Sequence, residues 1–188
     1  MNTSPKTPAV RPGPAPAATP VPATTAGTGT PRRRNRPKEI GTKAETAVVR
    51  FLRDHGFPGA ERRTLKGGKD QGDITGTPGV AWEIKTRNRN VSDAQIADWW
   101  DEAELEREHA EADVAVLVVK RPGHGLENAG DWWAYMDLAS VTALATAGNG
   151  FLPTAAPNFW VKTRLRDIVL ALRWAGYGEP LPPREVGE

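Results

Sequence analysis

The sequence predicts an α/β (α+β) domain with a central mixed β-sheet flanked by helices. Helical and strand patterns alternate along residues 39–188. The run at 113–120 is apolar and rich in valine, which is typical of a central strand buried on both faces. The chain of 188 residues contains no cysteine, so a disulfide scaffold and a cysteine-ligated metal site are both excluded.

The first 38 residues differ in composition from the rest of the chain. They hold seven Lys or Arg side chains, no Asp or Glu, and nine of the 17 prolines. Such a segment cannot bury enough apolar surface to fold, so residues 1–38 are predicted to be a disordered basic tail and residues 39–188 a single domain. The absence of an apolar signal core or membrane-length run predicts a cytoplasmic protein. The Ala-, Gly- and Arg-rich composition is typical of a high-GC bacterium or its phage, so the predicted setting is a bacterial or phage-infected host cell.

The first half of the domain is predicted to contain one helix and three strands. Apolar residues recur at helical spacing over 42–55, and Thr42 with Glu45 fits a capping box at its start. The predicted strands lie at 57–64, 73–76 and 80–87, with a charged, glycine-rich loop at 66–72 and a turn at 77–79.

The second half is predicted to alternate in the same way. A long helix at 92–112 precedes the strand at 113–120, and a further strand at 132–138 precedes helices at 139–147 and 164–174. The predicted order is α-β-β-β-α-β-β-α-α, ending in a helical extension. The many acidic residues over 101–113 are interpreted as a solvated helix face.

The strand at 80–87 carries the side chains most suited to catalysis or metal binding. Side chains alternate across a strand, so Glu83 and Lys85 share one face and lie about 7 Å apart. A hairpin through the turn would bring Asp73 beside Glu83. Two adjacent carboxylates repel one another unless a cation lies between them, and hard divalent ions favour such oxygen ligands. A neighbouring lysine could orient the water bound to that ion.

Glu45 is open to two interpretations. It is close to the apolar face of its helix, so it can point toward the sheet and add a third carboxylate to the site. It can equally be the third residue of the capping box with Thr42.

Together these residues resemble the motifs of the PD-(D/E)xK nuclease superfamily. The matching segments are Gly41–Glu45, Gly72–Ile74 and Glu83–Lys85, in the order and spacing of that superfamily. Gly72 stands in place of the motif's proline. Among its members the chain is most similar to the archaeal and phage-type Holliday junction resolvases, over residues 41–119.

The resemblance implies a restriction-endonuclease-like core and Mg²⁺-dependent (or Mn²⁺-dependent) hydrolysis of DNA. Asp73, Glu83 and the Ile84 carbonyl would hold the metal, Lys85 would position the attacking water, and Glu45 would contact a metal or its water. Gln95 opens a Gln-x-x-x-Trp pattern, which resembles the Gln-x-x-x-Tyr element of exonuclease-type relatives. It could reach the site as a further catalytic residue and touch a phosphate or Lys85, or it could be an ordinary polar residue at the helix edge.

Basic residues around these motifs predict contacts with DNA phosphates. The predicted contacts are Arg32, Arg33, Arg34, Arg36, Arg62, Arg63, Lys66, Lys69, Arg87 and Arg89. For the basic tail the alternative is a solubilising or address segment. The predicted partners are branched DNA, with a four-way junction preferred, and a second copy of the chain, because a resolvase cuts two strands symmetrically. No nucleotide-binding glycine loop with its lysine and serine is present.

Three alternatives remain open. The chain could be an exonuclease or a restriction- or repair-type nuclease of the same fold. It could be a non-catalytic DNA-binding or assembly protein, or an unrelated α/β domain in which the short motifs occur by chance.

Overall fold

The computed structural model describes residues 36–64, 70–87, 89–145 and 159–181, without the side chain of Arg36. Most of the predicted tail (1–35) and most of the predicted glycine-rich loop (65–69) lie outside these ranges. The described helices are α1 (Arg36–Asp54), α2 (Asp93–His109), α3 (Leu138–Ala145), α4 (Leu165–Trp174) and the 3-10 helix η1 (Leu126–Asp131). The described strands are β1 (Glu61–Arg62), β2 (Ile74–Thr75), β3 (Val80–Lys85), β4 (Val114–Val119), β5 (Trp133–Asp137) and β6 (Trp160–Arg164).

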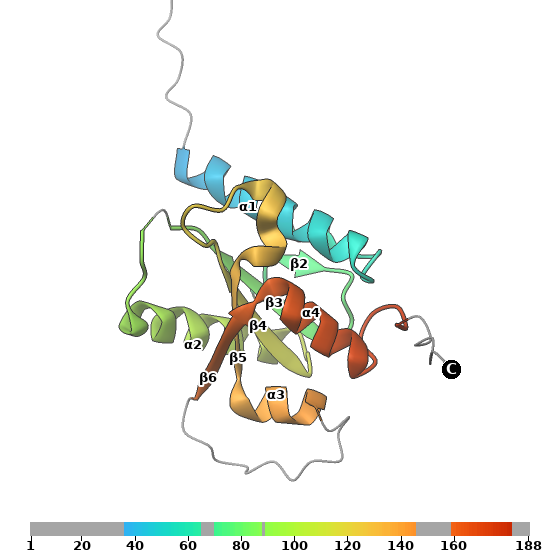
Figure 1. Ribbon diagram of the computed structural model, residues 1–188. Coiled ribbons are helices and arrows are strands. Elements are labelled where there is room, and N and C mark those ends of the chain that lie inside the picture. The colour runs from blue at the N-terminus through green and yellow to red at the C-terminus, as the bar shows by residue number, and fades with distance from the viewer. Residues whose placement is uncertain (1–35, 65–69, 88, 146–158, 182–188) are drawn as a thin grey trace, which may run out of the picture. The chain divides into compact units, whose positions relative to one another are not determined.

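Four strands form a mixed sheet in the order β3-β4-β5-β6, and helices flank it (Figure 1). β3 and β4 are parallel, whereas β5 is antiparallel to both β4 and β6. The predicted mixed α/β architecture is therefore confirmed. β1 and β2 form a separate antiparallel pair beside the outer edge of β3, where the Asp73 N–H donates to the Trp82 carbonyl at 2.8 Å.

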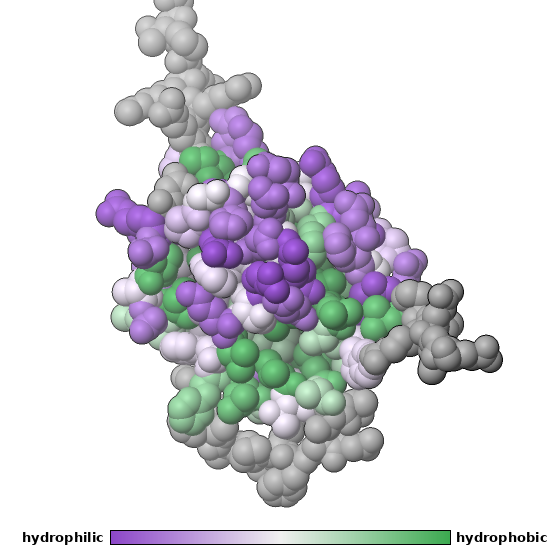
Figure 2. Space-filling model, in the orientation of Figure 1, coloured by the Kyte–Doolittle hydropathy of each residue, from purple (hydrophilic) through white to green (hydrophobic). Residues whose placement is uncertain are grey.

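The sheet separates two apolar cores. α1, η1, α3 and α4 pack against one face, and α2 packs against the other. β4 contributes alternate residues to both cores, with Val114, Val116 and Val118 on one side and Ala115, Leu117 and Val119 on the other. This arrangement explains its uninterrupted apolar sequence. In the orientation of Figure 1, Figure 2 shows hydrophilic side chains over the middle of the visible face and hydrophobic ones lower down, toward α3.

α1 begins earlier than the sequence predicts, at Arg36 rather than at residue 42. Proline is accepted in the first turn of a helix, where its missing N–H has no partner to lose, so Pro37 does not delay the start. An ion pair between Lys43 and Glu39, at 3.2 Å and four residues apart, supports the extra turns. Thr42 is therefore inside the helix, and the predicted capping box with Glu45 is wrong.

β6 is absent from the predicted order, and the C-terminal part is consequently not the purely helical extension that was expected. β6 pairs with β5 along its whole length, from Trp133 opposite Arg164 to Asp137 opposite Trp160. Its Trp, Val and Thr residues favour a strand, but the segment is too short for its pattern to stand out. Among the described helices, none has the length and hydrophobicity needed to cross a membrane.

Candidate functional site

Gly72 allows β2 to begin against the edge of β3. It has a φ of +90°, and a Cβ at this position would lie 2.8 Å from the Trp82 carbonyl oxygen. A side chain would therefore be both strained and obstructed. Glycine here lets the backbone of Asp73 approach close enough to bond to Trp82.

Asp73 and Glu83 lie side by side at this edge, as the sequence predicts. Asp73 Oδ2 accepts a hydrogen bond from the Ile84 N–H at 2.8 Å, and its carboxyl group contacts that of Glu83. Burial, followed by the negative charge of Glu83, raises the pKa of Asp73 to about 8. Burial and the charge of Glu106 raise the pKa of Glu83, which is 7% exposed, to about 7.

The Ile84 carbonyl faces the same edge. The N–H and C=O of one strand residue point to the same side, and the Ile84 N–H points toward Asp73 and away from β4. The predicted third oxygen ligand is therefore directed to the side on which Asp73 lies.

Lys85 lies between two carboxylates from different elements. Its Nζ is 2.5 Å from Glu83 Oε1 and 2.5 Å from Glu102 Oε2 on α2. Burial alone would lower the pKa of Lys85, but the charges and hydrogen bonds of Glu83 and Glu102 outweigh it and raise the pKa above its usual value. Lys85 is thus a fixed cation beside the Asp73–Glu83 pair.

Glu106 was not among the predicted site residues, and its assignment to a solvated face is wrong. It is 7% exposed, and its Oε2 is buried without a hydrogen-bond partner. Its carboxyl group contacts that of Glu83. Burial, together with the charges of Asp70 and Asp73, raises its pKa to about 7. The signal was present in the sequence, because Glu106 lies three and seven positions after the buried Ala103 and Trp99, on the same side of α2.

We call Asp73, Glu83, Glu102 and Glu106, together with Lys85, the carboxylate cluster. The cluster holds four acidic groups and one ammonium group, which pairs with Glu83 and Glu102. Burial of unbalanced charge is unfavourable unless a further cation or proton compensates it.

Glu45 is near this cluster but has a cation of its own. Its Oε2 is 2.7 Å from both Nε and Nη2 of Arg62. Its charge contributes to the raised pKa of Asp73, so the two carboxylates are within electrostatic range. Glu45 and Asp73 line the same open pocket of about 390 Å³. Its other lining residues are Lys38, Gly41, Thr42, Arg62, Arg63, Thr64, Asp70 and Gly72.

Gln95 is not placed at the carboxylate cluster. It lies in the first turn of α2 and accepts a hydrogen bond from Arg87 at 3.3 Å, and the Arg87 guanidinium lies 5.6 Å from the ring centroid of Trp99. α2 runs back along β3, so its last turns, and not its first, meet Glu83. The predicted contact of Gln95 with Lys85 or a phosphate therefore has no support from its position.

The predicted DNA contacts fall into different environments. Arg62 and Arg63 line the pocket, and Arg63 donates to Gln71 at 2.6 Å while its buried Nε has no partner. Arg87 and Arg89 are exposed beyond the end of β3. The remaining predicted contacts are outside the described part of the chain, as whole residues or, for Arg36, as a side chain: Arg32, Arg33, Arg34, Arg36, Lys66 and Lys69.

Two carboxylates and one carbonyl are oxygen donors of the kind that a hard divalent ion takes. Among the described residues, no group of three or more acidic or histidine side chains is arranged to hold a metal ion. Mg²⁺ is commonly bound by one or two carboxylates, with water and substrate oxygens completing its shell, so it needs no closed protein cage. Asp73, Glu83 and the Ile84 carbonyl supply ligands of this kind.

Comparisons with family models, with curated proteins and with solved structures find no match to this chain. Any inference about its function therefore depends on the geometry of the site and on the sequence motifs.

Proposed function

We propose that this chain is a Mg²⁺-dependent, structure-selective DNA endonuclease with a restriction-endonuclease-like core, acting on four-way junctions as a Holliday junction resolvase. The observation that supports it most is the buried Asp73–Glu83 pair on an edge strand, with Lys85 fixed beside it. Such an arrangement can hold a cation against a phosphodiester while an ammonium group stays within reach of the attacking water.

In this proposal the residues of the site have different roles. Asp73, Glu83 and the Ile84 carbonyl hold the divalent ion, for which Mn²⁺ can substitute. The bound ion would neutralise charge on the scissile phosphate and lower the pKa of a coordinated water. Lys85 orients that water and stabilises the negative charge that develops on the phosphate oxygens. Glu45 acts through water or a second ion, and it fixes Arg62 at the pocket wall for contact with the DNA backbone.

The proposed preference for four-way junctions requires that the chain act as a homodimer. Resolution of a junction needs two symmetric cuts, and two copies related by a twofold axis supply two sites. Size-exclusion chromatography with light scattering, with and without a junction, measures the copy number directly.

The test is cleavage of a labelled four-way junction and a matched linear duplex in Mg²⁺ or EDTA. Glu83→Gln and Lys85→Ala are compared with two control variants, Glu108→Gln and Lys43→Ala, which remove the same charges from exposed helix positions. We expect paired nicks in the junction that need Mg²⁺, loss of cutting in both site variants, and normal cutting in both controls.

Other outcomes identify the alternatives. Equal cutting of both substrates would indicate an exonuclease or a restriction- or repair-type enzyme. Tight junction binding with no cutting in Mg²⁺ or Mn²⁺ would indicate a DNA-binding or assembly protein. Neither binding nor cutting would contradict the proposal.

A further inference from the structure

Trp133 holds two cations at the end of the sheet. The Arg121 guanidinium carbon lies 4.3 Å from the centroid of the Trp133 ring, and Lys162 Nζ lies 4.4 Å from it. Lys162 Nζ is also 5.8 Å from the ring centroid of Tyr135. Arg121 follows β4, Trp133 begins β5 and Lys162 lies within β6, so the fold brings three separate segments to this point. We call Arg121 and Lys162 on Trp133 the cation pair.

The cation pair keeps its charge. An aromatic ring holds a cation through its quadrupole and does not neutralise it, whereas a carboxylate partner does. Within the described ranges, neither Arg121 nor Lys162 forms an ion pair with a carboxylate, but Arg62, Arg164 and Arg166 each do. Two ordered positive charges without acidic partners are suited to an anionic ligand.

The position of the cation pair relates it to the carboxylate cluster. Lys85 pairs with Val119 across β3 and β4, and Val119 pairs with Trp133 across β4 and β5. The Lys120 N–H also donates to the Lys85 carbonyl at 2.9 Å, which fixes the start of the segment that carries Arg121. Trp133 is therefore two strands from Lys85, or about 10 Å. Along the axis of a DNA duplex that distance corresponds to about three base-pair steps, at a rise of about 3.4 Å each.

We propose that the cation pair binds backbone phosphates of the DNA strand that passes the carboxylate cluster, about three nucleotides from the scissile phosphate. This inference rests on the proposed nuclease function, because it assigns the strand to that site. The contact is with phosphate and carries no sequence information. Trp133 contributes by ordering both side chains before the DNA arrives, which reduces the entropy lost on binding.

The experiment measures binding of a fluorescent four-way junction and a linear duplex in EDTA, over a series of salt concentrations. The variant Arg121→Gln/Lys162→Gln is compared with Arg107→Gln/Arg173→Gln. The control removes the same charge from the last turns of α2 and α4, away from this end of the sheet. We expect the first variant to bind at least about tenfold more weakly and to lower the slope of log K against log salt by about two. The control should change neither quantity appreciably.

A second pair of variants tests the ordering role of Trp133. Trp133→Leu keeps both charges but removes the ring, so affinity should fall several-fold while the salt slope stays near the wild-type value. Trp133→Phe keeps a ring and should restore most of the affinity. Thermal unfolding of each variant shows whether a loss of binding comes from a loss of folding instead.

The results separate this inference from the proposed function. If the wild type cuts DNA but the Arg121→Gln/Lys162→Gln variant binds with unchanged affinity and slope, the inference is wrong and the nuclease proposal stands. If the wild type cuts nothing but this variant loses affinity and slope, the phosphate contact stands and the nuclease proposal fails. Equal losses in the control, or no DNA binding by the wild type, would overturn the inference.

Discussion

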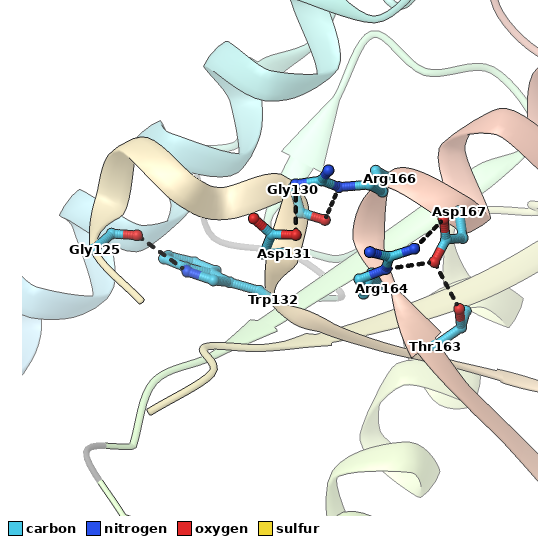
Figure 3. Close-up of polar contacts among 8 residues, drawn as sticks. All are labelled: Gly125, Gly130, Asp131, Trp132, Thr163, Arg164, Arg166 and Asp167. Atoms are coloured by element: carbon cyan, nitrogen blue, oxygen red, sulfur yellow. Dashed lines mark hydrogen bonds and ion pairs between the residues drawn. The ribbon is translucent and has the colours of Figure 1, made fainter. Parts of the chain in front are cut away.

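The carboxylate cluster beside β3 and a second charged cluster between η1, β6 and α4 balance their charge in opposite ways. In the second cluster Arg164 pairs with Asp167 at 2.9 Å and Arg166 with Asp131 at 2.5 Å (Figure 3). Thr163 and the Gly130 carbonyl add hydrogen bonds, so each acid has its own basic partner, and both ion pairs are partly open to water. In the carboxylate cluster, only Glu83 and Glu102 pair with Lys85, while Asp73 and Glu106 form no ion pair among the described residues; Glu83 and Glu106 are 7% exposed.

The difference is between a cluster with matched charges and one with an excess of acidic groups. Matched surface pairs contribute little to stability and need no ligand. A buried surplus of one charge makes the folded state less stable, and such groups are concentrated at functional sites. The opposite shifts in pKa agree with this distinction. Burial alone would raise the pKa of Asp167, but hydrogen bonds from Arg164 and Thr163 lower it, whereas burial and like charge raise the pKa of Asp73.

The largest effect is expected at Asp73. Asp73→Asn keeps an oxygen for the Ile84 N–H but removes one negative charge from the carboxylate cluster. We expect Mg²⁺-dependent cleavage to fall by more than about a hundredfold. In EDTA at pH 8 the free energy of unfolding should rise by about 1–3 kcal/mol, because a buried like charge is lost. Cleavage rates and urea unfolding measure the two quantities, and a loss of both would indicate general damage to the fold.

The pH dependence of stability is the next expected effect. The folded-state pKa values of Asp73, Glu83 and Glu106 are raised to about 8, 7 and 7, so the folded chain binds more protons than the unfolded chain between about pH 4 and 8. Stability from this cluster should therefore decrease as pH rises through that window. Asp167 has the opposite sign, since its lowered pKa contributes stability that is lost as the solution becomes acidic.

Melting temperatures in EDTA and in Mg²⁺ measure this effect. The added ion should stabilise the protein more at pH 8 than at pH 5, because it replaces the protons that the cluster has lost. Asp73→Asn should reduce the difference between the two pH values. An equal gain from Mg²⁺ at both pH values would contradict the surplus-charge interpretation.

A moderate effect is expected at Glu106. Glu106→Gln removes the negative charge of a buried carboxylate whose Oε2 has no hydrogen-bond partner. In EDTA at pH 8 the free energy of unfolding should therefore rise by about 1–2 kcal/mol. Glu108→Gln removes the same charge from an exposed position of α2 and should change stability by less than about 0.5 kcal/mol. Denaturant unfolding of the two variants, Glu106→Gln and Glu108→Gln, measures this difference. Equal changes in stability would count against an effect of burial at Glu106.

The smallest effect is expected in the balanced cluster. Arg166→Gln breaks the pair with Asp131 at the surface, and stability should fall by at most about 1 kcal/mol. Cleavage should stay at the wild-type rate, because these residues lie on elements that contribute nothing to the carboxylate cluster. A large loss of activity would show that the two clusters are coupled.

The features that could be predicted from the sequence are those that depend on a short, continuous stretch of residues. Alternation along β3 places Glu83 and Lys85 on one face, and the nearby turn brings in Asp73, so these three positions follow from short stretches of sequence. Helical spacing places Glu106 on the buried side of α2. That Glu106, and not Gln95, meets Glu83 depends on how α2 lies across the sheet, which local pattern does not specify. β6 was missed because its five residues acquire their strand character largely from pairing with β5.

The hydrogen bond from Ile84 to Asp73 has a further consequence for self-association. β3 is the edge strand of the sheet, and an edge with free N–H groups is a template on which another chain can add a strand. Asp73 occupies that edge with its own N–H and its carboxylate, which leaves Trp82 and Ile84 unavailable to an incoming strand. The residue proposed to bind the metal thus also covers this edge. An alanine there would lose the carboxylate that accepts from the Ile84 N–H but would keep the backbone hydrogen bond to Trp82, so only one of the two groups would become free.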